Sequence, residues 1–431
     1  MSDQNPPPGT LAQRFFGLDI HKHYLVAMAV DPDGKKVYGP RRVAWADLEA
    51  WHSKSLTPND AVVIEMTSNT WEVYDELQPH VHSVTVVHPP HVKMVTQPRV
   101  MTDKIAAFNL AVLLSKGLLK GIWIPPQEVR ERRALLAQRT KMTRLATQAK
   151  NRLHSALHRR HILPCEGDLF HPSRRDWWLG LPLSASEKVR ILCDLDTLAF
   201  ARQQIAILEA HLCQLAAQEP RLPLLLQLPG FNLINALTIL AAIGDISRFP
   251  DAKHLVGYAG LGARIHDSGL TTHSGRITKA GRKDLRAALV QAAQTAANTH
   301  PHWQAELARL EPRLGRNKAI VAIARKLLVA IWHVLTFQVA DKHADPVRVA
   351  RKLMQVTYKL GQANRPSRQS SAAYVRSQLD CILTFKLSPP GGKINLENEP
   401  TWTLESPANE DRRQGDEKGG RLRTDTESIS Y

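Results

Sequence analysis

The chain of 431 residues has only four cysteines, and they lie far apart in the sequence. No two of them form a CxxC pair, which argues against a structural zinc site and against a disulfide framework. Long apolar runs are also lacking, and none reaches the length that a bilayer-spanning helix needs. The first residues, MSDQNPPPGTLAQR, lack the apolar core of a signal peptide. We therefore expect a protein of the reducing cytoplasm with no membrane partner.

Acidic residues are scarce relative to basic ones. Lys and Arg total 57 against 40 Asp and Glu, which gives a formal net charge of +17 and a pI near 9.9. Such an excess favours a polyanionic partner, because each neutralised phosphate releases counterions. A generally basic surface or a ribosome-associated protein would have the same balance. Composition alone therefore does not distinguish these classes from a DNA enzyme.

The first part of the chain has the pattern of an α/β domain over residues 13–124, preceded by a Pro-rich, disordered arm at 1–12. Helices are expected near 71–78 and 103–119. Five segments predict strands: RFFGLDI (14–20), YLVAMAV (24–30), the run after the Asp31-Pro-Asp-Gly34 turn, AVVIEM (61–66) and VHSVTVVH (81–88). Three antiparallel strands followed by alternating helices and strands predict a mixed α/β sheet.

Two long segments, 126–160 and 186–217, have helical apolar spacing and almost no Gly. They predict two antiparallel helices that form a coiled-coil arm over 125–221, with the turn near Trp177 and Trp178. The first helix has one basic face, which either lies on nucleic acid or is simply solvated. Its residues are Arg130, Arg133, Lys141, Arg144, Arg152, Arg159 and Arg160.

The rest of the chain predicts a mostly helical domain at 222–340, C-terminal helices at 341–385 and a polar, disordered tail at 386–431. Pro229-Gly230-Phe231 lies between two helical patterns and resembles a helix-hairpin-helix turn. Such turns hold a nucleic-acid backbone through main-chain N–H groups. A plain connection between two helices has the same pattern.

Three acids occupy positions that suit a metal site. Asp19 and Glu65 each stand at the end of a predicted strand, and Asp103 begins a predicted helix. A carboxylate at the end of a central strand is costly unless it is hydrogen-bonded or binds a cation. Such a set can hold Mg²⁺ against a phosphodiester, and the order of elements is that of the RNase H or RuvC nuclease sheet. Each acid alone could instead be a capping or turn residue.

The segment from Leu255 to Arg282 has six glycines, which permit close approach of the backbone to a ligand. Within it, Ser268 could serve as a nucleophile if a nearby base or metal activated it. The residues alone favour a loop that grips phosphate without covalent chemistry, since most loop serines only bond locally. Basic residues are interleaved with these glycines, among them Arg264, His266, Arg276, Lys279, Arg282 and Lys283.

Together these blocks resemble the IS110 (IS one-ten) family of insertion-sequence transposases, described as bridge-RNA-guided recombinases, over roughly residues 14–340. Both halves of the family pattern occur in the family's order and are separated by a long helical arm. The first-half blocks are GLDIHK (17–22), IEMTSNTW (64–71) and TDKIAAFNLA (102–111). The second-half blocks are LPGFNLINALTILAAIGDISRF and YAGLGARIHDSG, followed by GRITKAG.

The resemblance implies a RuvC-like domain with four acids and a later domain with a catalytic serine. Carried over to this chain, the acids that act in catalysis and bind Mg²⁺ are Asp19, Glu65 and Asp103, and the nucleophile that attacks DNA is Ser268. The fourth acid is expected three residues after the third, where this chain has Ala106.

The implied partners are the DNA of the element ends and target, a noncoding guide RNA that pairs with both, and further copies of the chain in a homodimer or homotetramer. The residues expected to bind nucleic acid are Arg264, Arg276, Lys279, Arg282 and Lys283. Two alternatives stay open. One is a RuvC-like nuclease that uses water and forms no covalent link, and the other is an inactive nucleic-acid-binding relic, which Ala106 favours.

Overall fold

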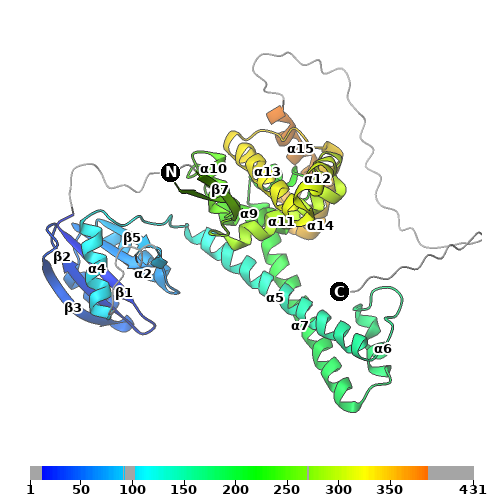
Figure 1. Cartoon of the computed structure of the whole chain (residues 1–431), viewed down its shortest axis with the longest axis horizontal. Coiled ribbons are helices and arrows are strands. Elements are labelled where there is room, and N and C mark those ends of the chain that lie inside the picture. Colours follow the sequence, from blue (N-terminus) through cyan, green and yellow to red (C-terminus); the bar gives the residue numbers. More distant parts are fainter. Residues whose placement is uncertain (1–11, 91, 93–101, 269–270, 387–431) are drawn as a thin grey trace, which may run out of the picture.

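The computed structural model describes residues 12–90, 92, 102–268 and 271–386 (Figure 1). The disordered arm predicted at 1–12 and the tail predicted at 386–431 lie almost wholly outside these residues. The described chain has three parts. A five-stranded sheet and the helices that cover it form one end of the molecule, a long helical arm follows, and a mostly helical region includes a two-stranded hairpin. The expected mixed α/β architecture followed by helices is confirmed.

The sheet has the strand order β3-β2-β1-β4-β5. Its strands are β1 (Arg14–Ile20), β2 (Tyr24–Val30), β3 (Lys36–Ala44), β4 (Asp60–Glu65) and β5 (Ser83–Val87). β2 pairs antiparallel with β1 and β3, whereas β4 pairs parallel with β1 and β5. The parallel pairs therefore direct the carboxyl ends of β1, β4 and β5 to the same edge of the sheet.

Helices cover both faces of the sheet. Phe16 and Leu18 point to the face that packs against α1 (Leu48–Ser55) and α2 (Thr70–Leu77). The next position on β1, Gly17, faces α4 (Asp103–Ser115) instead, because side chains alternate along a strand. A Cβ on Gly17 would overlap the Ala107 carbonyl oxygen, so α4 lies directly on the backbone of β1.

The predicted arm is confirmed as two helices of 33 residues, α5 (Gln127–Arg159) and α7 (Ala185–Ala217), which pack side by side. The capping box of Ser184 and Glu187 begins α7. Between them lie η3 (Pro172–Arg174) and α6 (Arg175–Gly180). Trp178 of α6 is fully buried against the two long helices, so the tip of the arm has its own small core.

The second half of the chain packs around α13 (Arg316–Phe337), which contacts α10 (Ala252–Tyr258), α11 (Lys283–Thr299) and α12 (Pro301–Leu314). By length and composition α13 could span a membrane, contrary to the expectation that no run is long enough, but it lies in the largest core cluster of the described residues. The other helices are α8 (Leu222–Leu226), α9 (Leu233–Ile243), α14 (Pro346–Leu360) and α15 (Ser371–Lys386).

Two expectations for this region need correction. The Gly-rich segment is not an open loop, because β6 (Ala263–Ser268) and β7 (Thr271–Ile277) pair as an antiparallel hairpin. The Pro229-Gly230-Phe231 turn does join two helices, but it faces inward. Pro229 and Phe231 are buried, and a Cβ on Gly230 would overlap the carbonyl oxygen of Ala292 in α11. The turn is therefore a packed connection and not a surface for nucleic acid.

Candidate active site

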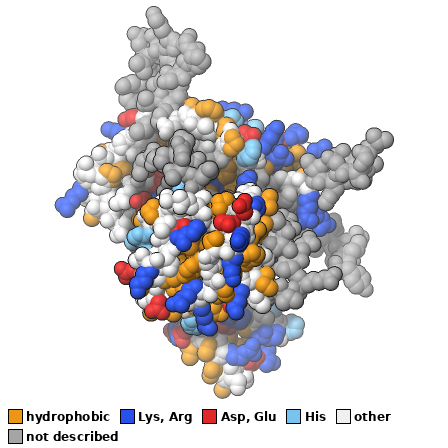
Figure 2. Space-filling view, turned by 90° about the vertical axis from the view of Figure 1, so that its left-hand side faces the viewer, with side chains coloured by type: hydrophobic (Ala, Val, Ile, Leu, Met, Phe, Trp, Pro, Cys, Tyr) orange, Lys and Arg blue, Asp and Glu red, His pale blue; other side chains and the backbone are white. Residues whose placement is uncertain are grey.

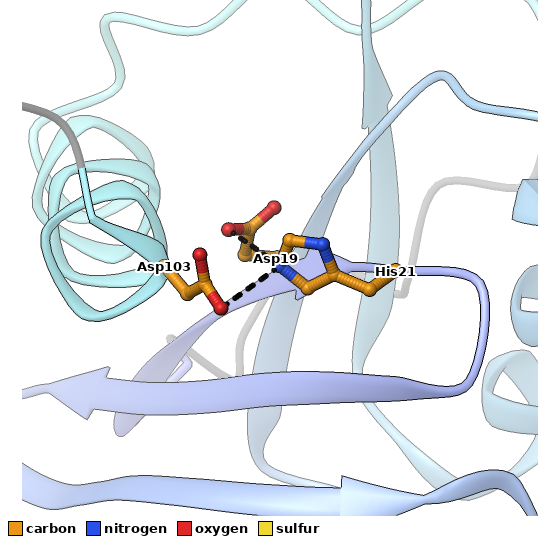
Figure 3. Close-up of side chains that lie close together, drawn as sticks. All are labelled: Asp19, His21 and Asp103. Carbon is orange, nitrogen blue, oxygen red and sulfur yellow. Dashed lines mark ion pairs between the residues drawn. The ribbon is translucent and has the colours of Figure 1, made fainter.

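Three side chains converge at the carboxyl end of β1 (Figure 3). Nε2 of His21 lies 3.3 Å from Oδ2 of Asp19 and 3.3 Å from Oδ2 of Asp103. One ligand atom from each residue lies within 4.8 Å of the others. Among the described residues, no other three His, Cys, Asp or Glu side chains come so close together. We refer to Asp19, His21 and Asp103 as the acidic cluster.

Strand geometry explains why Asp19 belongs to this cluster. It follows Leu18, which pairs with Ile64, so Asp19 is the neighbour of Glu65 across the parallel pair β1–β4. Asp19 points to the same face as Gly17, which is the face covered by α4. Glu65 lies at the same edge of the sheet, but its oxygens lie outside the group of atoms within 4.8 Å.

Asp103 is held at the first turn of α4. Thr102 caps the helix directly before Asp103, and its hydroxyl accepts a hydrogen bond from the backbone N–H of Ile105. The Tyr24 hydroxyl donates to Oδ2 of Asp103 at 3.0 Å, and this hydrogen bond is the main cause of the raised pKa of Tyr24. Arg42 stacks over the Tyr24 ring at 3.7 Å. These contacts orient the Asp103 carboxylate toward Asp19.

The cluster concentrates negative charge in a partly buried place. Burial raises the pKa of Asp19, His21 counteracts this rise, and the charge of Asp103 adds to it. Nε2 of His21 is buried between the two carboxylates without a hydrogen bond of good geometry. A protonated His21 or a bound cation would each relieve the repulsion between the acids. Sequence reasoning assigned no role to His21, although its i+2 spacing from Asp19 was the available signal.

Ala106 lies one helical turn after Asp103, as expected from the spacing. Its backbone N–H donates to the Thr102 carbonyl at 2.8 Å, and its side chain is half-buried. The methyl group offers no ligand atom where a fourth acid was expected. The acidic cluster therefore has two carboxylates in contact with His21, Glu65 lies outside it on the adjacent strand, and the second turn of α4 adds no acid.

Ser268 is the last residue of β6 and pairs with Thr271 of β7. Its side chain is outside the described part of the structure. The hairpin belongs to the mostly helical region, whereas the acidic cluster belongs to the sheet, and Figure 1 shows the two apart. One chain in this conformation therefore does not bring Ser268 and Asp19 into a single site.

The basic residues divide into exposed and internally bonded ones. Arg264, Arg276, Lys279 and Lys283 around the hairpin are exposed, whereas Arg282 pairs with Asp284. Figure 2 shows Lys and Arg spread over the sheet end of the molecule with acidic side chains among them.

On α5 the expected nucleic-acid face is largely engaged within the chain. Arg130 pairs with Asp75, Arg133 bonds to backbone carbonyls, and two further arginines pair with acids of α7. Those pairs are Arg152–Asp194 and Arg160–Glu187. Most of this face therefore stabilises the arm and its root.

Comparison with known families decides the class of protein. Residues 16–162 match a family model described as a DEDD transposase of the IS110 type, and residues 222–308 match the model of the transposase IS116/IS110/IS902 family. The chain carries the transposase domains of the IS110 family. The predicted family and the predicted enzyme class are thus confirmed, and transposases act on DNA. A DEDD-type domain also indicates a divalent metal, for which the acidic cluster is a possible site.

Named relatives agree with this assignment. The chain is 29% identical over 343 residues to the pilin gene-inverting protein of Moraxella bovis, an alignment that covers 75% of this chain and 96% of that protein. It is 26% identical to the transposase for insertion sequence element IS1111A of Coxiella burnetii, over 75% of this chain and 90% of the relative. A putative transposase of Sinorhizobium fredii is 26% identical, over 79% and 86% of the two chains.

Proposed function

We propose that this transposase cuts and rejoins DNA at a RuvC-like site that holds Mg²⁺. The observation that carries the proposal is the convergence of Asp19, His21 and Asp103 at the carboxyl end of β1. Carboxylate oxygens are the ligands that Mg²⁺ prefers. Asp19 and Asp103 would hold the ion, with Glu65 of the adjacent strand as the third acid. The strand order and the helix-borne Asp103 also support the RuvC-like assignment.

Each residue has a distinct part in this reaction. When bound, Mg²⁺ polarises the phosphodiester and stabilises its developing charge. Asp19 and Asp103 position the ion, and Tyr24 keeps the Asp103 carboxylate in place through its hydrogen bond. Ser268 is the proposed nucleophile: its Oγ bonds to phosphorus, the bond from phosphorus to one DNA oxygen breaks, and that oxygen leaves as a hydroxyl.

The separation of the sheet from the β6–β7 hairpin bears on how this site assembles. Ser268 and Asp19 must meet at one phosphodiester for both to act on it. We propose that they meet when DNA is bound, either through movement within one chain or between copies in a homodimer or homotetramer. Mixing a Ser268→Ala chain with an Asp19→Asn chain tests this point. Recovery of recombination in the mixture would show that the site forms between copies.

A covalent-trapping experiment tests the serine. End-labelled DNA carrying the element end is incubated with the protein and Mg²⁺, and protein-linked DNA is separated under denaturing conditions. We expect the adduct with the unaltered chain and with the control Ser274→Ala in β7, and none with Ser268→Ala. Cleavage without any adduct would favour the alternative, a metal-dependent nuclease that uses water. Neither cleavage nor adduct, with DNA binding retained, would favour the inactive relic that Ala106 suggests.

We also propose that a noncoding RNA guides the reaction. The family resemblance supports this, and so do the net charge of +17 and the exposed Arg264, Arg276, Lys279 and Lys283, which lie in or directly after the β6–β7 hairpin. RNA that copurifies with the chain should map to the DNA flanking its gene and should contain segments matching donor and target. Recombination that proceeds equally well after complete RNase treatment and repurification would contradict the guide.

A further inference from the structure

Three arginines from separate segments meet at the root of the arm. Arg133 lies on α5, Arg248 follows α9, and Arg282 precedes α11. The pKa of Arg133 is lowered to about 10, first by burial and then by the positive charge of Arg282, with a further contribution from Arg248. Burial also lowers the pKa of Arg248. We refer to these three residues as the arginine cluster. Asp284 pairs with Arg282 and Asp245 acts on Arg248, so three positive charges face two negative ones and leave an excess that favours a further anion.

Arg248 is enclosed by aromatic rings. Its Cζ lies 4.1 Å from the ring centroid of Trp123 and 4.5 Å from those of Phe249 and Tyr258. Rings on the faces of a guanidinium leave its edges available for hydrogen bonds. Its Nε and Nη2 are buried and have no hydrogen-bond partner among the described residues. These two atoms form the edge that grips two oxygens of a phosphate or carboxylate side-on.

In Arg133 and Arg309 the same edge of the guanidinium is filled, whereas Arg130, Arg132 and Arg365 lack a partner at Nε alone. Nε and Nη2 of Arg133 donate to the carbonyls of Ala241 and Ala242 at 2.7 and 2.9 Å. Nε and Nη2 of Arg309 donate to the two carboxylate oxygens of Glu306 at 3.0 and 2.7 Å. Buried donors are rarely left unpaired in proteins. Arg248 differs from these arginines in that both atoms of its edge, Nε and Nη2, are unpaired, which leaves room for an acceptor from outside the chain.

Trp123, the ring nearest to the Arg248 guanidinium, belongs to the connection between the sheet and the arm. Ile122 and Ile124 pack against the core of the sheet, and Trp123 between them turns the opposite way. Its ring lies against Gly244 at the end of α9, where a Cβ would be 3.0 Å from Cζ2 of Trp123. Trp123 is therefore a contact through which the sheet is held to the mostly helical region.

We propose that the arginine cluster is a binding site for a backbone phosphodiester of nucleic acid, which Trp123 covers in the unbound chain. The side-on edge of Arg248 binds two phosphate oxygens, and Arg133 and Arg282 add positive charge. Because Nε and Nη2 are buried, a neighbouring group must move for the phosphate to enter, and we assign this movement to Trp123, whose ring is the nearest of the three. Nucleic-acid binding thus loosens the connection between the acidic cluster and the β6–β7 hairpin. The choice of nucleic acid as the ligand rests on the proposed function. The arginine cluster itself is a second binding site, separate from the catalytic residues.

Equilibrium binding tests the site without requiring any chemistry. Labelled DNA and RNA of one sequence are titrated with the chain at several salt concentrations, using Arg248→Gln and the matched control Arg309→Gln. We expect Arg248→Gln to bind about ten- to a hundredfold more weakly, with a salt slope reduced by about 0.9, the value of one DNA phosphate. Arg309→Gln should match the unaltered chain. Equal binding by both variants would overturn the proposal.

Two further variants, Arg248→Lys and Trp123→Ala, distinguish a loss of binding from a loss of folding. Arg248→Lys keeps the charge but loses the side-on edge, so we expect weaker binding with an unchanged salt slope. Trp123→Ala should bind nucleic acid more tightly, since no cover is displaced. In the unaltered chain, nucleic acid should change tryptophan fluorescence, and Trp123→Phe should lack that change. Weaker binding by Trp123→Ala would show that Trp123 is no cover and would overturn the proposal.

Two further arms identify the ligand and separate this site from the catalytic one. Inorganic phosphate is titrated alone. If it changes the fluorescence of Trp123 whereas DNA and RNA do not, the ligand is a free oxyanion and the nucleic-acid proposal is wrong. Ser268→Ala is taken through both the DNA titration and the covalent-trapping experiment. If Ser268→Ala still forms adducts, the proposed serine nucleophile is wrong. The arginine cluster is judged only by how its own variants bind in the titration.

Discussion

Replacement of Gly17 by alanine tests how closely α4 must lie on β1. An added Cβ would overlap the carbonyl oxygen of Ala107 and would lie 2.6 Å from the backbone N of Ala111 and 3.0 Å from Cβ of Leu110. Two of these three atoms are backbone, so no side-chain rotation relieves the contact. We expect Gly17→Ala to lower the free energy of unfolding by about 3 kcal/mol, the upper part of the range for overpacked cores.

The same substitution should affect the acidic cluster. Relief of the overlap requires α4 to move away from β1, and α4 carries Asp103 whereas β1 carries Asp19. Their carboxylates meet at a shared His21 nitrogen 3.3 Å from each, so a movement of about 1 Å would open the site. Mg²⁺ binding measured by calorimetry should therefore weaken together with stability.

The control is Gly257→Ala in α10, where an added Cβ meets nothing within 4 Å. Alanine is preferred over glycine inside a helix by up to about 1 kcal/mol, so this variant should be as stable as the unaltered chain or more so. Both variants are compared in chemical denaturation followed by circular dichroism. If Gly17→Ala unfolds at the same denaturant concentration as Gly257→Ala, the close approach of α4 to β1 is wrong.

Three further predictions follow from the described contacts. Ala106→Asp should tighten Mg²⁺ binding and raise recombination, since it adds a carboxylate one turn from Asp103; no gain in either assay would show that the chain does not need a fourth acid. Tyr24→Phe should weaken Mg²⁺ binding about tenfold in calorimetry, because Asp103 loses its hydrogen bond; unchanged binding would contradict this role. Burial lowers the pKa of Lys352 from 10.5 to about 8. Between pH 8 and 10.5 the unfolded chain therefore keeps a proton that the folded chain has released, and the free energy of unfolding should rise with pH. Denaturation of Lys352→Met should lack this part of the pH dependence, and an identical pH profile for both chains would refute it.

Much of the sheet could be predicted from the sequence. β1 and β2 have the predicted bounds, 14–20 and 24–30, because apolar runs flanked by polar turns define central strands without further context. The long helices α5 and α7 were also predicted to within two residues, since their apolar spacing continues over many turns. Asp19 and Asp103 were expected to lie together on the basis of strand order, and they do.

What the sequence did not reveal depends on contacts between distant segments. The strands of the β6–β7 hairpin, ARIHDS and TTHSGRI, consist mostly of polar and charged residues and have no apolar run, so their pairing is not evident from local pattern. The Pro229-Gly230-Phe231 turn has the residues of an exposed turn, and only its packing on α11 shows that it is buried. Likewise, the contact between Trp123 and Arg248 joins positions 125 residues apart, and no local pattern specifies it.

The length of the arm has a mechanical consequence. An α-helix rises 1.5 Å per residue, so the 33 residues of α5 make a rod about 50 Å long. Its root is fixed by Arg130 to Asp75 of α2 and by Arg133 to the end of α9. A tilt of about 10° at that pivot would displace the far tip by roughly 9 Å, nearly two helical turns. Small changes at the root of this lever are thus amplified at its tip.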